Sequence, residues 1–103
     1  MLKIREYKEL ILNHRFYEAH EVLEEFWFPR RKEKTPTTLI VKGFINAAVA
    51  FELKKRAREK RAIVVWGNYI KFMKLLDKEP KEELLELKSF IDNFANNYLF
   101  NNS

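Results

Sequence analysis

Cysteine is absent from this 103-residue chain, and glycine and proline are scarce, with two and three residues. The lack of cysteine excludes disulfides and thiolate metal sites, and it suits a reducing compartment. Sheet proteins need many turn residues, so the scarcity of glycine and proline argues against a β-rich fold. We therefore expect a helical protein of the cytoplasm.

Long hydrophobic runs are also missing. The first residues, 1–6, are amphipathic and charged, and they do not resemble a signal peptide. The longest nearly apolar stretch, 43–53, contains Asn46 and Glu52 and is too short to cross a bilayer. We expect no membrane partner and interpret this stretch as part of a buried core helix.

The composition that remains is that of a globular protein, with 47% hydrophobic and 34% charged residues. Residues 1–103 are predicted to form a single domain. Apolar side chains recur three to four residues apart in five segments, which predicts helices over about 2–12, 16–28, 35–56, 61–76 and 81–100. The third is apolar on most sides, which favours a central position. The expected fold class is all-α, a compact bundle of about five helices.

The most distinctive segment is 16–27, which contains Glu18-Ala19-His20-Glu21, then Leu23-Glu24 and Trp27. In these residues the chain resembles a bacterial and archaeal family called domain of unknown function 309, whose signature reads Glu-Ala-His-Glu, Leu-Glu and Trp. The run Gly43-Phe44-Ile45-Asn46-Ala47-Ala48 is similar to a second, weaker family motif. The resemblance covers roughly 5–76. It implies a fold and, as the family's name says, no established activity.

Two positions depart from the family's pattern. Glu52 stands where the family tends to have a histidine, and His14 stands where it tends to have a glycine before the Phe-Tyr pair. The first departure weakens any site that would depend on a second histidine.

A helical wheel places His20 at the edge of the apolar side of its helix, with Glu24 as its neighbour four residues on. Glu52 falls among apolar neighbours on the third helix, where a carboxylate needs a partner. We expect His20 to contact Glu24 or Glu52, with Phe16 and Trp27 shielding it. The candidate polar cluster comprises Glu18, His20, Glu21, Glu24, Trp27 and Glu52.

This cluster has two main interpretations. The favoured one is a structural hydrogen-bond network at the edge of the core. The other is a metal site with His20, Glu24 and Glu52 as ligands, a carboxylate-rich set that suits manganese or iron better than structural zinc. Acid–base catalysis by His20 beside Glu24 is a third. No oxyanion hole or glycine-rich phosphate loop is recognisable, so we lean against an enzyme, and the sequence names no cofactor or small-molecule ligand.

Half of the 20 basic residues lie in two segments, 30–34 and 54–61. The third helix separates them by about 30 Å, so they form no single patch for phosphates. Nucleic-acid binding through these basic helix ends is therefore disfavoured, and with protein interaction it forms the alternative function. On the fourth helix Val64, Phe72 and Leu75 lie outside the main stripe, which would leave apolar surface for a homo-oligomer. The expected stripe is Ala62, Ile63, Trp66, Tyr69, Ile70, Met73 and Leu76.

Overall fold

The computed structural model describes residues 2–101. Over this range the chain forms five α-helices and no strand: α1 (Ile4–Leu12), α2 (Phe16–Trp27), α3 (Pro36–Lys55), α4 (Glu59–Met73) and α5 (Glu82–Tyr98). Two short 3-10 helices, η1 (Phe28–Arg30) and η2 (Lys74–Asp77), continue α2 and α4. The predicted all-α class is confirmed.

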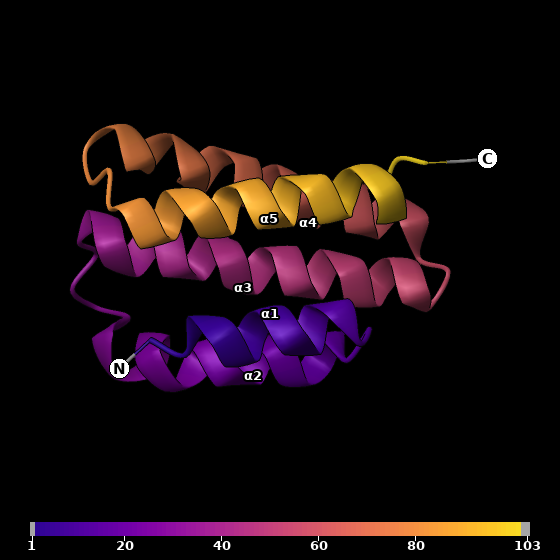
Figure 1. Cartoon of the computed structure of the whole chain (residues 1–103), viewed down its shortest axis with the longest axis horizontal. Coiled ribbons are helices and arrows are strands. Elements are labelled where there is room, and N and C mark those ends of the chain that lie inside the picture. Colours follow the sequence, from indigo (N-terminus) through magenta and orange to yellow (C-terminus); the bar gives the residue numbers. More distant parts are fainter. Residues whose placement is uncertain (1, 102–103) are drawn as a thin grey trace.

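Helix α3 runs through the middle of the bundle, with α1 and α2 on one side and α4 and α5 on the other (Figure 1). It packs most extensively on α4 and on α2, while α1 packs on α2. Seven of its apolar side chains are fully buried: Ile40, Val41, Phe44, Ala47, Ala48, Ala50 and Phe51. The central position predicted for the third helix is therefore confirmed.

By length and composition alone, Pro36–Lys55 could cross a membrane, a property that the shorter stretch 43–53 does not have. The core helix of a soluble protein meets the same two criteria, because it too is long and mostly apolar. In this fold more than half of the helix is buried against the other elements. That is the arrangement expected of a core helix.

Gly43 lets α3 and α4 approach each other closely. A Cβ atom at this position would lie 2.7 Å from Met73 Cε and 2.9 Å from Phe72 Cβ. Contacts this short would force α4 outward, since Phe72 Cβ is fixed to the backbone. The close approach of α3 and α4 therefore depends on a residue without a side chain at position 43.

Three loop residues other than glycine adopt left-handed backbone: His14, Lys34 and Ala57, with φ of 58°, 53° and 62°. His14 lies at the predicted break between the first two helices, and its conformation explains why a glycine would suit the position. Its ring stacks on Phe16 at 5.2 Å between centroids, and Lys55 Nζ donates to its carbonyl oxygen. These contacts hold the start of α2 in place.

The inward face of α4 differs from the predicted stripe. Ile63 and Ile70 are 47% and 49% exposed, and Val65 is buried in the core in their place. Phe72 and Leu75, expected to remain free, pack against the core, whereas Val64 is 62% exposed as expected. The helix is therefore turned slightly from the predicted orientation, and in this orientation Phe72 and Met73 lie opposite Gly43 of α3.

Candidate functional site

His20 makes two hydrogen bonds along its own helix. Its Nδ1 lies 2.8 Å from the carbonyl oxygen of Tyr17, and its Nε2 lies 2.9 Å from Glu24 Oε1. These two contacts hold the ring between the preceding turn and the following turn of α2. Its side chain is 17% exposed.

Glu52 has a different partner. Arg56 Nε donates to Glu52 Oε2 at 2.6 Å, one turn further along the chain at the end of α3. The carboxylate that the sequence left unexplained is thus neutralised by the residue four positions on, which is a common spacing for ion pairs on helices. His20 therefore contacts Glu24, and Glu52 belongs to a separate pair.

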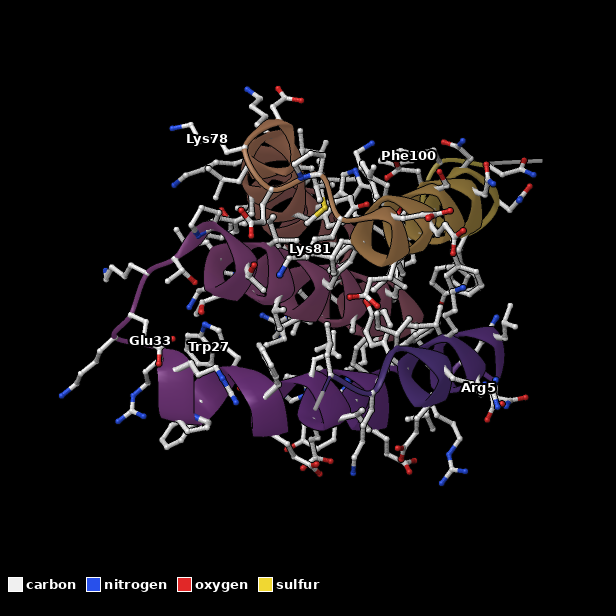
Figure 2. All side chains as sticks on the ribbon, turned by 60° about the vertical axis from the view of Figure 1, so that its left-hand side comes forward. Arg5, Trp27, Glu33, Lys78, Lys81 and Phe100 are labelled. Atoms are coloured by element: carbon white, nitrogen blue, oxygen red, sulfur yellow. The ribbon has the colours of Figure 1, made fainter. Side chains whose placement is uncertain are left out.

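The other predicted members of the cluster lie further away. Glu18 forms a two-point ion pair with Arg15, at 2.7 and 2.8 Å, and Glu21 is exposed. Trp27 lies about two turns from His20 along α2, near the loop marked by Glu33 in Figure 2, where Lys42 Nζ is 4.3 Å from its ring. Trp27 therefore does not shield His20 as expected, because the ring belongs to the other end of the helix.

The predicted metal ligands are not assembled. Within residues 2–101, no three histidine or carboxylate side chains lie close enough together to hold a metal ion. His20 and Glu24 are adjacent, but the third ligand of the predicted set, Glu52, is engaged by Arg56. Of the candidate cluster, Glu18, His20, Glu24 and Glu52 each have a hydrogen-bond or ion-pair partner, and Glu21 is exposed.

His20 lines a small hollow between α2 and α3, the α2–α3 cleft. Its volume is about 230 Å³, below the range typical of small-molecule sites. Apolar walls predominate, and the two charged groups at its rim are already paired. Its lining residues are Phe16, Tyr17, His20, Val49, Glu52, Leu53 and Arg56.

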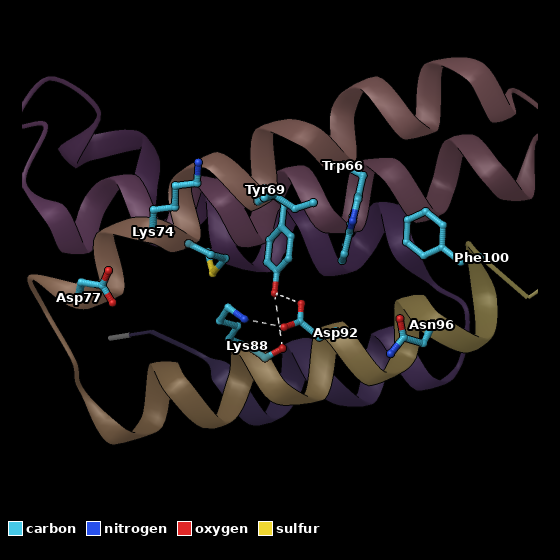
Figure 3. Close-up of a pocket in the computed structure, with 10 residues that line it drawn as sticks. Trp66, Tyr69, Lys74, Asp77, Lys88, Asp92, Asn96 and Phe100 are labelled. Atoms are coloured by element: carbon cyan, nitrogen blue, oxygen red, sulfur yellow. Dashed lines mark hydrogen bonds and ion pairs between the residues drawn. The ribbon is translucent and has the colours of Figure 1, made fainter.

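A larger hollow of about 490 Å³, the α4–α5 groove, separates the last two helices (Figure 3). Trp66, Tyr69, Ile70 and Met73 contribute an apolar wall from α4, and α5 contributes a polar wall. The polar wall consists of Lys88, Asp92 and Asn96. This groove was not predicted, although the three polar residues follow one another at intervals of four on one side of a helix whose other side faces the core, and that spacing was a usable signal.

A short hydrogen-bond chain crosses the groove. The hydroxyl of Tyr69 donates to Asp92 Oδ1 at 2.8 Å, and Lys88 Nζ donates to Asp92 Oδ2 at 2.7 Å (Figure 3). Burial, followed by the hydrogen bond and charge of Asp92, raises the pKa of Tyr69 above its ordinary value. The tyrosine therefore stays a neutral donor, and Asp92 is satisfied on both oxygens.

Exposed apolar side chains gather around the same groove. Among residues 2–101, eight large hydrophobic side chains are exposed, and five of them lie on α4, on α5 or just after it: Ile63, Val64, Ile70, Leu85 and Phe100. Ile70 and Phe100 line the groove itself. Leu85 precedes Lys88 by three residues, so it projects from the same side of α5. Gly67 sits between Ile63 and Ile70, with open space where a Cβ would point.

A family model described as domain of unknown function (DUF309) matches residues 4–65. The chain belongs to the DUF309 family. The match contains the Glu-Ala-His-Glu helix and the Gly43 motif, and it ends within α4, short of the residue 76 expected from the sequence. The second half of α4 and all of α5 lie outside it. No curated protein and no solved structure gives a significant match.

Proposed function

We propose that this DUF309 protein is a protein-interaction module that binds its partner through one face of α4 and α5. We define the α4–α5 face as Ile63, Gly67 and Ile70 of α4, Leu85 of α5, and Phe100. The observation that carries the proposal is that five of the eight exposed large hydrophobic side chains of the described chain lie on or just after the two helices that form this groove, and two of them, Ile70 and Phe100, line it. Contiguous apolar surface on a soluble protein is typical of interaction sites.

The hydrogen bonding of His20 supports placing the function on this face rather than at the signature helix. Both nitrogens of His20 are used within α2, and the carboxylate of Glu52 is used by Arg56. A ligand in the α2–α3 cleft would have to displace these contacts. The α4–α5 groove is more than twice as large, and two of the residues that line it, Ile70 and Phe100, expose apolar side chains.

Site-specific photo-crosslinking in living cells tests the proposal. A photoreactive amino acid at position 63 or 70 should give a discrete adduct, because both side chains lie on the proposed interface. The matched control is position 12, where Leu12 is equally apolar and exposed but belongs to α1. A Leu85→Asp substitution should remove the adduct from position 70. Equal labelling at all three positions, or none at 63 and 70, would contradict the proposal.

Nucleic-acid binding is a second candidate, favoured by three aromatic–cation pairs around the end of α2. Arg30 lies 4.0 Å over the ring of Phe26, Arg31 lies 3.9 Å over Phe28, and Lys42 covers Trp27. These rings already have cations on them, so a base could stack only by displacing its neighbour.

We therefore expect weak binding of a single-stranded oligonucleotide, with affinity that falls steeply as salt is added. Fluorescence anisotropy at two salt concentrations measures both properties. A tight complex that resists salt and is weakened by neutralising Lys54, Lys55 and Arg56 would favour this candidate over the first.

A further inference from the structure

We infer that the partner of the α4–α5 face is a second copy of this chain. The inference rests on the proposed function and adds the identity of the partner. It starts from the way the last two helices are held. Both pack on the rest of the bundle through their inner sides, but they contact each other sparsely and leave the groove open between them. A second α4–α5 pair packed against the first, with its helices in the same direction, would cover both grooves and form a four-helix bundle.

The charges at one end of this face are complementary to each other. Lys71 and Lys74 lie at the end of α4, and the first turns of α5 carry Glu82 and Glu86. The turn between α4 and α5 brings these two groups to the same end of the molecule (Figure 1). None of the four makes an ion pair within residues 2–101.

A two-fold axis parallel to the helices uses this arrangement twice. It stacks α4 of one copy on α5 of the other at the same height, so Lys71 and Lys74 of each copy face Glu82 and Glu86 of its neighbour. The interface is isologous, which is the commonest symmetry of soluble oligomers. The same operation brings Ile63 of each copy toward the end of α5 that carries Phe100 in the other.

Gly67 supports a close approach of helices at this surface. A glycine inside a helix is less stable than alanine, and nothing in the described chain lies within 4 Å of the position its Cβ would take. The fold itself therefore gives no steric reason for it. The chain's other glycine, Gly43, occupies the point where α3 and α4 touch inside the bundle. Gly67 offers the same flat backbone on the outer side of α4, between Ile63 and Ile70.

A charge exchange tests the inference. The first variant carries Lys71→Glu and Lys74→Glu, and the second carries Glu82→Lys and Glu86→Lys. Each alone would place like charges opposite each other twice, so its dimer should weaken roughly tenfold or more. In a mixture of the two, both contacts become complementary, and dimers should return. A Lys32→Glu, Lys34→Glu variant makes the same change in net charge as the first variant, but in the α2–α3 loop, and should dimerise like the wild type.

Sedimentation equilibrium reads the result as mass, with the wild type approaching twice the 12.5 kDa of one chain. Circular dichroism confirms that each variant is folded before it is compared. A wild type that stays monomeric at millimolar concentration would overturn the inference, as would a dimer that both charge variants leave intact. Adducts to a different protein from positions 63 and 70 would then keep the proposed function and reject the second copy. Loss of both adducts and dimer would reject both.

Discussion

The two hydrogen bonds of His20 give this single residue a measurable share of the stability of α2. His20→Ala removes the ring that contacts Glu24 and the carbonyl oxygen of Tyr17, and we expect the free energy of unfolding to fall by roughly 1 kcal/mol, since the side chain of Glu24 is 40% exposed and keeps access to water. Urea denaturation measures the change, with the exposed Glu21→Ala on the same helix as control. If His20 instead holds a metal, chelator will lower the melting temperature of the wild type, and the purified protein will contain metal that the variant lacks.

The two glycines should respond to alanine with opposite signs. Gly43→Ala forces Phe72 and Met73 to move and should destabilise the fold by about 1–3 kcal/mol. Gly67→Ala meets no atom within 4 Å and should stabilise the monomer by about 1 kcal/mol through helix propensity. The comparison is made by thermal and urea unfolding at low protein concentration in the Lys71→Glu, Lys74→Glu background, where the proposed association is expected to be weakened. Equal effects of the two substitutions would show that the close crossing at Gly43 is absent in solution.

Of the two ion pairs between residues four apart that involve the candidate cluster, one was predicted from the sequence and the other was not. The pairing of His20 with Glu24 was predicted because the residues are four apart on one helix face. Glu52 and Arg56 have the same spacing, yet the pair was missed. Its wheel position suggested burial for Glu52, and Arg56 stood in a segment expected to form the turn. A pair at a helix end depends on where the helix stops, and local patterns determine that point poorly.

At the scale of the elements, the end of α3 is closed by a residue in an unfavourable conformation. Ala57 has a φ of 62°, and the amide of Arg58 donates back to the carbonyl of Leu53 at 2.8 Å, as at many helix ends that carry glycine. Ala57→Gly should therefore stabilise the protein by about 0.5–1 kcal/mol, because relief of the left-handed strain exceeds the added entropy of the unfolded chain. Ala57→Val is the opposite control and should destabilise it. Melting curves of the two variants decide the sign.

The helices themselves were predictable because their signals are local. Thr35 caps α3, accepting a hydrogen bond from the amide of Thr38 at 3.2 Å, and Pro36 opens the first turn. The orientation of α4 was not predictable, since Ile63, Val64 and Val65 are all apolar and consecutive. Which of them faces the core depends on how α4 packs on another helix, and there Val65 is buried while Ile63 and Val64 are exposed. The groove was missed for the same reason, because it depends on how far apart α4 and α5 are held.

At the scale of the whole molecule, two buried tyrosines should lower the free energy of unfolding at alkaline pH. Burial raises the pKa of Tyr7 well above its ordinary value, and burial with Asp92 does the same for Tyr69. Below about pH 10 both are neutral in the folded and unfolded states, so they add no pH dependence. Above it the unfolded chain releases protons that the folded chain retains, and stability falls by up to about 1.4 kcal/mol per pH unit for each tyrosine.

Urea unfolding between pH 8 and pH 12 measures this slope. Tyr69→Phe should make it shallower, since Asp92 keeps its contact with Lys88 and the rest of the site is unchanged. Tyr17→Phe removes the hydroxyl of an exposed tyrosine and serves as the matched control. A slope that Tyr69→Phe leaves unaltered would show that its hydroxyl is open to solvent.

The order in which the helices pack has a consequence for how the chain reaches its fold. Helix α2 packs on α1, α3 on α2, and α4 on α3, so most partners are neighbours along the chain. Bundles built from such local contacts close short loops and fold within microseconds to milliseconds. During synthesis each new helix up to α4 finds the surface it needs already made. The chain can therefore assemble from its N-terminus as it leaves the ribosome, with α5 added last.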